Sequence, residues 1–252
     1  MQMTRLATST WPDLAETAGS GAILLIPLGS TEQHGPHLPV TTDTDIAAAI
    51  VDAAASRDPR LVVAPPVAYG SSGEHRDFPG TLSIGQDATT LLLLELGRSA
   101  GVHFVRTVVV SAHGGNAVPL ARAMQRLAEE GHPVSAWSPP WSGDLHAGRL
   151  ETSLMLAIDP ERVHLDRAQA GDTRPLDEIL PLLRSTGVRP VSANGVLGDP
   201  AGARPEEGVR LLDQAVDALM TTLSAPPPGH APTTSPGRSN GADGVAALGV
   251  PS

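Results

Sequence analysis

Two short segments of this sequence bring together residue types that bind divalent metal ions. One is residues 29–37 (GSTEQHGPH), and the other is residues 111–116 (SAHGGN). The residues of ligand type in and near them are Glu32, His34, Asp43 and His113. Carboxylates and imidazoles are standard ligands of divalent cations, and a carboxylate such as that of Asp43 could bridge two ions about 3.5–4 Å apart. The sequence therefore predicts one or two divalent ions per chain, with zinc, iron or manganese all compatible with mixed nitrogen and oxygen ligands.

Each of these residues also has an ordinary structural explanation when it is taken alone. Asp43 could cap the start of a helix, because carboxylates accept hydrogen bonds from the free N–H groups there. His113 could be a hydrogen-bonded histidine beside a glycine turn, and Glu32 could be a solvated charge. Metal binding is favoured by their joint placement at the ends of predicted strands.

Predicted strands and helices alternate along the chain, which places the two segments at one edge of a sheet. Short apolar runs predict buried strands at residues 22–28, 61–64, 107–111 and 134–137. Helical patterns follow at residues 43–56, 87–99, 117–130, 150–158 and 206–223. Continuously apolar strands between helices predict an α/β fold of three layers, with helices on both faces of a mostly parallel sheet. Both segments follow strands, so they should open onto the edge where such sheets bind ligands.

The composition excludes several kinds of chemistry. The chain has no cysteine, and all 17 of its basic residues are arginine. Disulfides, thiol nucleophiles, Schiff-base lysines and the P-loop lysine are therefore excluded. A formal net charge of −10 and an aromatic content of 2% make nucleic acid an unfavourable partner. No G-x-G-x-x-G joins a strand to a helix and no G-x-S-x-G is present, which argues against nucleotide binding and serine hydrolysis.

The length of 252 residues is compatible with one large domain and a tail. We expect residues 1–224 to form the domain. Residues 225–252 are rich in Pro, Gly, Ser and Thr, and we expect them to be disordered because they can bury little apolar surface. The sequence shows no secretory signal and no apolar stretch of about 20 residues, so a cytoplasmic protein without membrane contact is expected.

Four motifs resemble the creatininase (creatinine amidohydrolase) family. They are GSTEQHGPHLPVTTDTDIA, GSSGEHRDFPGTLS, SAHGGN and HAGRLETS, which lie in this order between residues 29 and 153. The resemblance implies a metal-dependent amidohydrolase that assembles into homo-oligomers. It also implies that Glu32 and His113 hold one metal, that His34 holds the second, and that Asp43 bridges both. His146 would be the proton shuttle, although it could also be a plain histidine at a helix start.

The chain departs from creatininase itself at one ligand position. That enzyme has a glutamate two residues after the histidine of its SAHGGN-like motif, and this chain has Gly115 there. Either one metal site is weaker, or another carboxylate replaces the missing one. Glu151 is the candidate, although it could instead be a buried acid that ties its loop to the helix.

The predicted substrate contacts lie in loops that follow the strands. They are Ser72, His75, Gly114, Trp141 and Asp144, with Glu74 beside the first two. The Gly-flanked loop around Ser72 could equally be a self-bonded turn. Overall likeness within the family favours a member that trims a ribosomally made precursor peptide to release its C-terminal, Val-Tyr-derived core. The alternatives are hydrolysis of a small cyclic or formyl amide, and a metal-binding scaffold without turnover.

Overall fold

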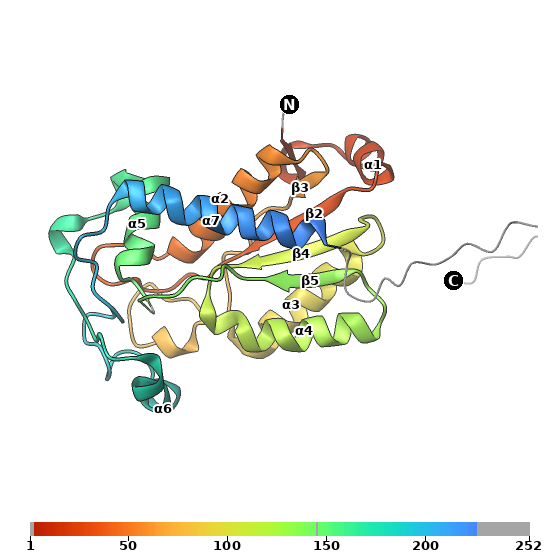
Figure 1. The fold of residues 1–252 in the computed structure, drawn as a ribbon. Coiled ribbons are helices and arrows are strands. Elements are labelled where there is room, and N and C mark those ends of the chain that lie inside the picture. The colour runs from red at the N-terminus through yellow and green to blue at the C-terminus, as the bar shows by residue number, and fades with distance from the viewer. Residues whose placement is uncertain (1–2, 145, 226–252) are drawn as a thin grey trace, which may run out of the picture.

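A parallel five-stranded sheet forms the centre of the molecule, with strand order β1-β3-β2-β4-β5 (Figure 1). The strands are β1 (Thr4–Arg5), β2 (Ile23–Leu28), β3 (Leu61–Val63), β4 (Arg106–Ser111) and β5 (Val134–Trp137). All neighbouring strands pair in parallel, as the apolar runs predicted. The computed structural model describes residues 3–144 and 146–225, so the tail predicted to be disordered lies, apart from Ala225, outside the described residues.

Helices cover both faces of the sheet and complete the three predicted layers (Figure 1). Side chains that alternate along a strand point to opposite faces. Leu25 of β2 therefore packs on one side with α2 (Thr42–Arg57), α5 (Arg149–Ile158) and α7 (Pro205–Ser224). Leu24 packs on the other side with α3 (Gly85–Ala100), α4 (Ala117–Glu129) and α1 (Trp11–Gly19). The α/β fold expected from the sequence is confirmed.

Some elements of the fold have weak signals in the sequence. Helix α1 buries no residue and β1 spans two residues, so neither shows a clear apolar pattern. Helix α6 (Leu176–Thr186) contains Pro181, which removes one backbone donor and interrupts the helical pattern. The described part of the chain also contains five short 3-10 turns: η1 (Leu6–Thr8), η2 (Gly73–His75), η3 (Gly114–Asn116), η4 (Pro160–Arg162) and η5 (Leu165–Arg167).

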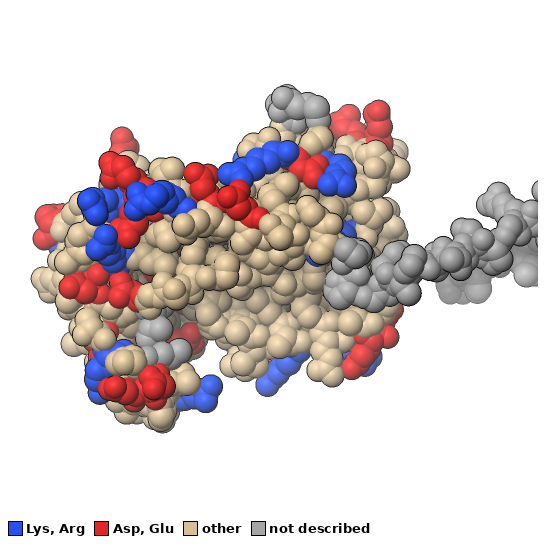
Figure 2. Space-filling view, viewed as in Figure 1, with Lys and Arg blue, Asp and Glu red and all other residues tan. Residues whose placement is uncertain are grey.

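The surface carries charges of both signs side by side. In Figure 2, basic and acidic side chains are mixed over the face that it shows, with a broad uncharged area between them. Arg57 of α2, for example, pairs with Asp213 and Asp217 of α7. Among residues 3–144 and 146–225, no helix is long and apolar enough to cross a membrane.

The crossing of α5 and α7 depends on a glycine. A Cβ atom added at Gly208 would overlap the carbonyl oxygen of Ser153, which belongs to the backbone of α5. We therefore expect Gly208→Ala to lower the free energy of unfolding by about 1–3 kcal/mol, because the helices must move apart. Urea unfolding followed by circular dichroism measures this.

The matched control is Gly19→Ala, where no atom lies within 4 Å of the added Cβ. It should leave the stability unchanged or slightly raised, because alanine favours helix over glycine. Equal stability of the two variants would show that α5 and α7 do not pack as closely as described.

Candidate metal centre

The four predicted ligands meet at the carboxyl edge of the sheet, although they come from separate elements. Glu32 and His34 lie in the loop after β2, Asp43 lies in the first turn of α2, and His113 directly follows β4. All four side chains are buried. Glu32, Asp43 and His113 each offer one ligand atom, and these atoms lie within 4.8 Å of one another.

The carboxylate of Asp43 stands between two histidines. Its Oδ1 atom lies 3.2 Å from Nε2 of His34, and its Oδ2 atom lies 3.2 Å from Nδ1 of His113. Ser30 also donates a hydrogen bond to Oδ2 at 2.6 Å. Because each oxygen faces a different imidazole, the carboxylate has the orientation that a bridging ligand requires.

Both histidines direct one ring nitrogen at this carboxylate and the other at a main-chain carbonyl. Nδ1 of His34 lies 3.1 Å from the main-chain oxygen of Glu32, and Nε2 of His113 lies 2.9 Å from the main-chain oxygen of Ser71. A carbonyl oxygen only accepts, so these nitrogens carry the ring protons. The opposite nitrogen of each ring faces Asp43, which is the pattern of histidines that bind metals.

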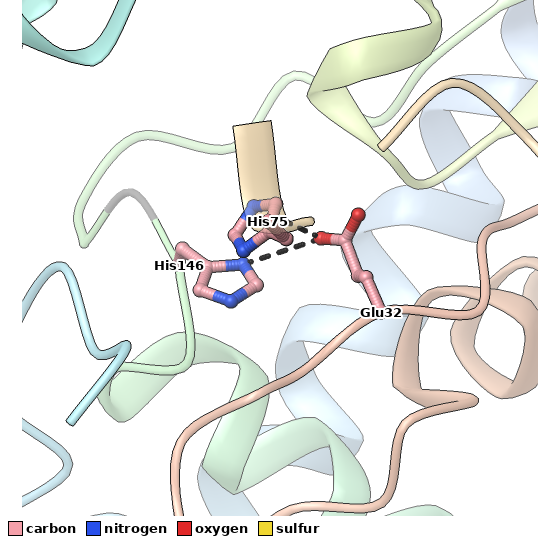
Figure 3. A group of neighbouring side chains, drawn as sticks. All are labelled: Glu32, His75 and His146. Carbon is pink, nitrogen blue, oxygen red and sulfur yellow. Dashed lines mark ion pairs between the residues drawn. The ribbon is translucent and has the colours of Figure 1, made fainter. Parts of the chain in front are cut away.

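The carboxylate of Glu32 is buried without a hydrogen-bond partner for either oxygen among the described residues. Oε2 lies 3.2 Å from Nε2 of His113, whereas Oε1 lies 3.4 Å from Nε2 of His75 and 3.6 Å from Nδ1 of His146 (Figure 3). Burial raises the pKa of Glu32 to about 7, although His113 opposes the shift. A buried carboxylate in this state requires a proton or a cation.

The surrounding electrostatics favour positive charge at the centre. Burial by itself would lower the pKa of His34 and of His113, but nearby carboxylates outweigh it. Asp43 raises the pKa of His34 to about 10, and Glu32 and Asp43 raise that of His113 to about 10. The field that holds protons on these rings also attracts a cation.

Glu151, in the first turn of α5, faces the same ring nitrogen of His34 as Asp43 does. Its Oε2 atom is 3.8 Å from Nε2 of His34 and accepts a hydrogen bond from the backbone of Ala147 at 2.6 Å. The two explanations considered for Glu151 are therefore compatible, because one carboxylate ties the loop to the helix and faces the centre. His34, His146 and Glu151 form a second group whose ligand atoms lie within 4.8 Å.

Gly115 has no room for a side chain. A Cβ atom there would overlap Nε2 of His113 and the main-chain oxygen of Ser71, and it would lie 2.5 Å from Oε1 of Glu74. Oε1 of Glu74 is 3.7 Å from Nε2 of His113. A second carboxylate thus occupies the space beside His113.

Three of the five predicted substrate contacts lie at the centre. Ser72 is buried with its Oγ atom 3.4 Å from Nε2 of His113, while His75 and Gly114 line a cavity of about 850 Å³ above the ligands. His146, the predicted proton shuttle, also lines this cavity.

Trp141 and Asp144 do not line this cavity. Trp141 is partly buried and packs against the apolar core on the face of the sheet that α2, α5 and α7 cover. Asp144 accepts a hydrogen bond at 2.6 Å from the backbone of Arg149, where α5 begins. The unpaired N–H groups of a helix N-terminus attract a carboxylate, and this accounts for the position of Asp144.

Two further parts of the site have no clear signal in the sequence. Gln33 is buried between two predicted ligands and contacts both His75 and His146. The sequence points to Gln33 only through its position between Glu32 and His34, because glutamine is not a typical metal ligand. The cavity wall opposite the ligands comes from α6 and includes Leu180, Leu183 and Arg184.

Comparison with known proteins identifies this arrangement. The creatininase family (creatinine amidohydrolase) matches residues 7–223. The mycofactocin precursor peptide peptidase of Mycobacterium ulcerans is 49% identical over 234 residues, which cover 89% of this chain and 92% of that protein. The enzyme of the same name from Mycolicibacterium smegmatis is 50% identical over 211 residues, covering 80% and 84%.

Solved structures of creatininase share the fold. A manganese form has a TM-score of 0.74 and 25% identity, covering 88% of this chain and 98% of that one. A mutant creatininase of the zinc type has a TM-score of 0.75 with the same identity and coverage. By the extent of these matches, this chain belongs to the creatininase family.

Proposed function

We propose that this protein is a metal-dependent peptidase that hydrolyses an amide bond of the mycofactocin precursor peptide and releases its Val-Tyr-derived core. The observation that carries the chemistry is the buried Asp43 carboxylate, which presents one oxygen to His34 and the other to His113. The substrate is supported by the identity of 49–50% to two peptidases that bear this name.

The donor set fits a pair of divalent ions. Glu32, Asp43 and His113 would hold one ion, and His34, Asp43 and Glu151 would hold the other. The unpaired oxygens of Glu32 and the ring nitrogens that His34 and His113 direct at Asp43 are what such ions require, because these nitrogens would release their protons as an ion binds. Divalent ions bound there would polarise an amide carbonyl and make water acidic enough to act as a nucleophile near neutral pH.

His146 is placed to move the proton that this reaction transfers. Its Nε2 atom donates to the main-chain oxygen of Gln33 at 2.8 Å, so the lone pair on Nδ1 faces Glu32. Burial and the positive charge of His34 lower the pKa of His146, which keeps the ring neutral. Nδ1 takes a proton from the attacking water and returns it to the departing amine nitrogen.

An assay of peptide cleavage distinguishes this function from the two other candidate functions, hydrolysis of a small amide and metal binding without catalysis. A small cyclic or formyl amide would fill little of a cavity of about 850 Å³, whereas the end of a peptide fits it. A scaffold would bind metal and peptide without cleavage. The choice among zinc, iron and manganese, the cytoplasmic location and the homo-oligomeric state stay predictions.

Removing the shared ligand should empty the centre. We expect Asp43→Ala to lose bound metal and activity together. The loss should far exceed the roughly 10–100-fold fall in metal affinity or activity that follows mutation of a residue that only hydrogen-bonds to a metal ligand. Elemental analysis of the purified protein and cleavage of the precursor peptide, followed by mass spectrometry, measure both effects.

The matched control is Asp45→Ala, also in the first turn of α2. Asp45 pairs with Arg162 at 2.9 Å, away from the centre. The bridging role of Asp43 is wrong if the Asp43→Ala variant keeps its metal and its turnover.

The carboxylate that replaces the missing glutamate can be identified by counting ions. Glu151→Gln preserves an acceptor for the backbone of Ala147 but removes the charge that faces His34. We expect the metal content to fall from about two ions per chain to about one.

Glu74→Gln provides the comparison and should leave the metal content unchanged. The opposite result, with one ion lost from the Glu74 variant and none from the Glu151 variant, would assign the ligand role to Glu74.

Loss of the proton shuttle should slow the reaction while the metal stays bound. For His146→Ala we expect kcat to fall about 10²–10⁴-fold, which is the usual contribution of a general acid or base. Metal analysis of the same sample completes the test, since loss of an ion would show that His146 is a ligand instead.

A further inference from the structure

One buried residue, Gln33, contacts two histidines at the centre: its side-chain amide faces His75, and its main-chain oxygen faces His146. Its Oε1 atom accepts a hydrogen bond from the backbone N–H of Gly35 at 2.8 Å. Its Nε2 atom donates to the main-chain oxygen of Gly195 at 2.9 Å. If the amide were rotated by half a turn, Oε1 would face the main-chain oxygen of Gly195 and Nε2 would face the backbone N–H of Gly35. Neither pair can form a hydrogen bond, so the orientation of the amide is fixed.

The second hydrogen on Nε2 of Gln33 defines the tautomer of His75. Nδ1 of His75 lies 2.9 Å from this nitrogen, and an N–H group needs a lone pair to bond with. Nδ1 of His75 is therefore the acceptor. The ring proton must then be on Nε2, which is the nitrogen nearer to Glu32.

In His146 the nitrogen that faces Glu32 is an acceptor, whereas in His75 it is a donor. Its Nε2 atom donates to the main-chain oxygen of Gln33, which leaves the lone pair on Nδ1. The Nε2 atoms of Gln33 and His146 are 3.1 Å apart, but their hydrogens are directed at other atoms. The rings of His75 and His146 have centroids 4.4 Å apart, so a donor and an acceptor stand side by side near Oε1 of Glu32 (Figure 3).

The Nε2–H group of His75 remains available to a ligand. It lies 3.4 Å from Oε1 of Glu32, but this oxygen has no hydrogen-bond partner among the described residues, so the N–H is not aligned with it. His75 lines the cavity. A nitrogen that carries a proton has no lone pair for a metal, which argues against a metal ion held jointly by Glu32, His75 and His146.

We propose that the Nε2–H group of His75 is an oxyanion donor, which bonds the oxygen of the scissile carbonyl as charge develops on it. This role rests on the proposed amide hydrolysis. Water adds to the carbonyl carbon, its proton goes to Nδ1 of His146, and the carbonyl π electrons move to the oxygen. His75 donates a hydrogen bond without transferring its proton. The carbonyl then re-forms as the C–N bond breaks, and the nitrogen takes the proton from His146.

Nuclear magnetic resonance of the ring nitrogens tests the tautomer independently of activity. The zinc-loaded protein is labelled with ¹⁵N-histidine, and the signals of His75 are assigned by their loss in the His75→Gln variant. We expect the correlation pattern of a neutral ring protonated on Nε2. A ring protonated on Nδ1 would overturn the proposal.

Kinetics tests the catalytic role. His75→Ala should lower kcat about 10²–10³-fold, as loss of one oxyanion donor does, with KM changed less than about threefold. The metal content should not change. His75→Gln should recover part of the rate, because its amide also carries an N–H donor. His103→Gln, an exposed histidine in the turn after α3, is the matched control and should behave as the unmodified enzyme.

Other results would contradict this role. Loss of a metal ion from His75→Ala would make the residue a ligand, and a change in KM alone would make it a ground-state contact. If the unmodified, metal-loaded enzyme cleaves no amide, the proposed function fails and the catalytic role fails with it. The resonance experiment still decides which nitrogen of His75 carries the proton.

Discussion

The buried carboxylate of Asp43 is the interaction on which the rest of the site depends. A carboxylate that is 2% exposed must be compensated, because burying an unpaired charge is very unfavourable. Here the compensation comes from His34 in one loop and His113 in another, with Ser30 as a further donor. The pairing therefore fixes the start of α2 against the ends of β2 and β4, and the positions of Glu32 and His75 follow from it.

Main-chain carbonyls around the centre set the orientation of three of its histidine rings. The rings of His34, His113 and His146 each donate outward to a main-chain carbonyl, so their free nitrogens point at carboxylates. His75 is the exception, because Gln33 donates to it rather than accepting from it. A cluster made largely of acceptors with one inward donor suits a reaction that must bind cations and also stabilise a new negative charge.

Much of this site could be predicted from sequence, because its ligands directly follow apolar strands. Glu32 and His34 come after β2, and His113 comes after β4, so the parallel sheet alone brings them together. The α6 wall was missed since Pro181 interrupts its pattern. Gln33 was missed because its importance lies in which atoms its amide faces, and only the folded chain shows that. Asp144 was expected near substrate; in the structure it accepts a hydrogen bond at the start of α5, and its predicted contact with substrate stays a prediction.

Gly115 limits how this enzyme can diverge. A single codon change to glutamate would restore the residue type that creatininase has at this position, yet a Cβ atom there overlaps the backbone of Ser71 and the ring of His113. The loop that holds Ser71 and Glu74 would have to move first. A carboxylate at position 115 and the present course of the backbone around Ser71 are therefore incompatible, so backbone geometry as well as ligand chemistry separates this chain from a centre with a glutamate there.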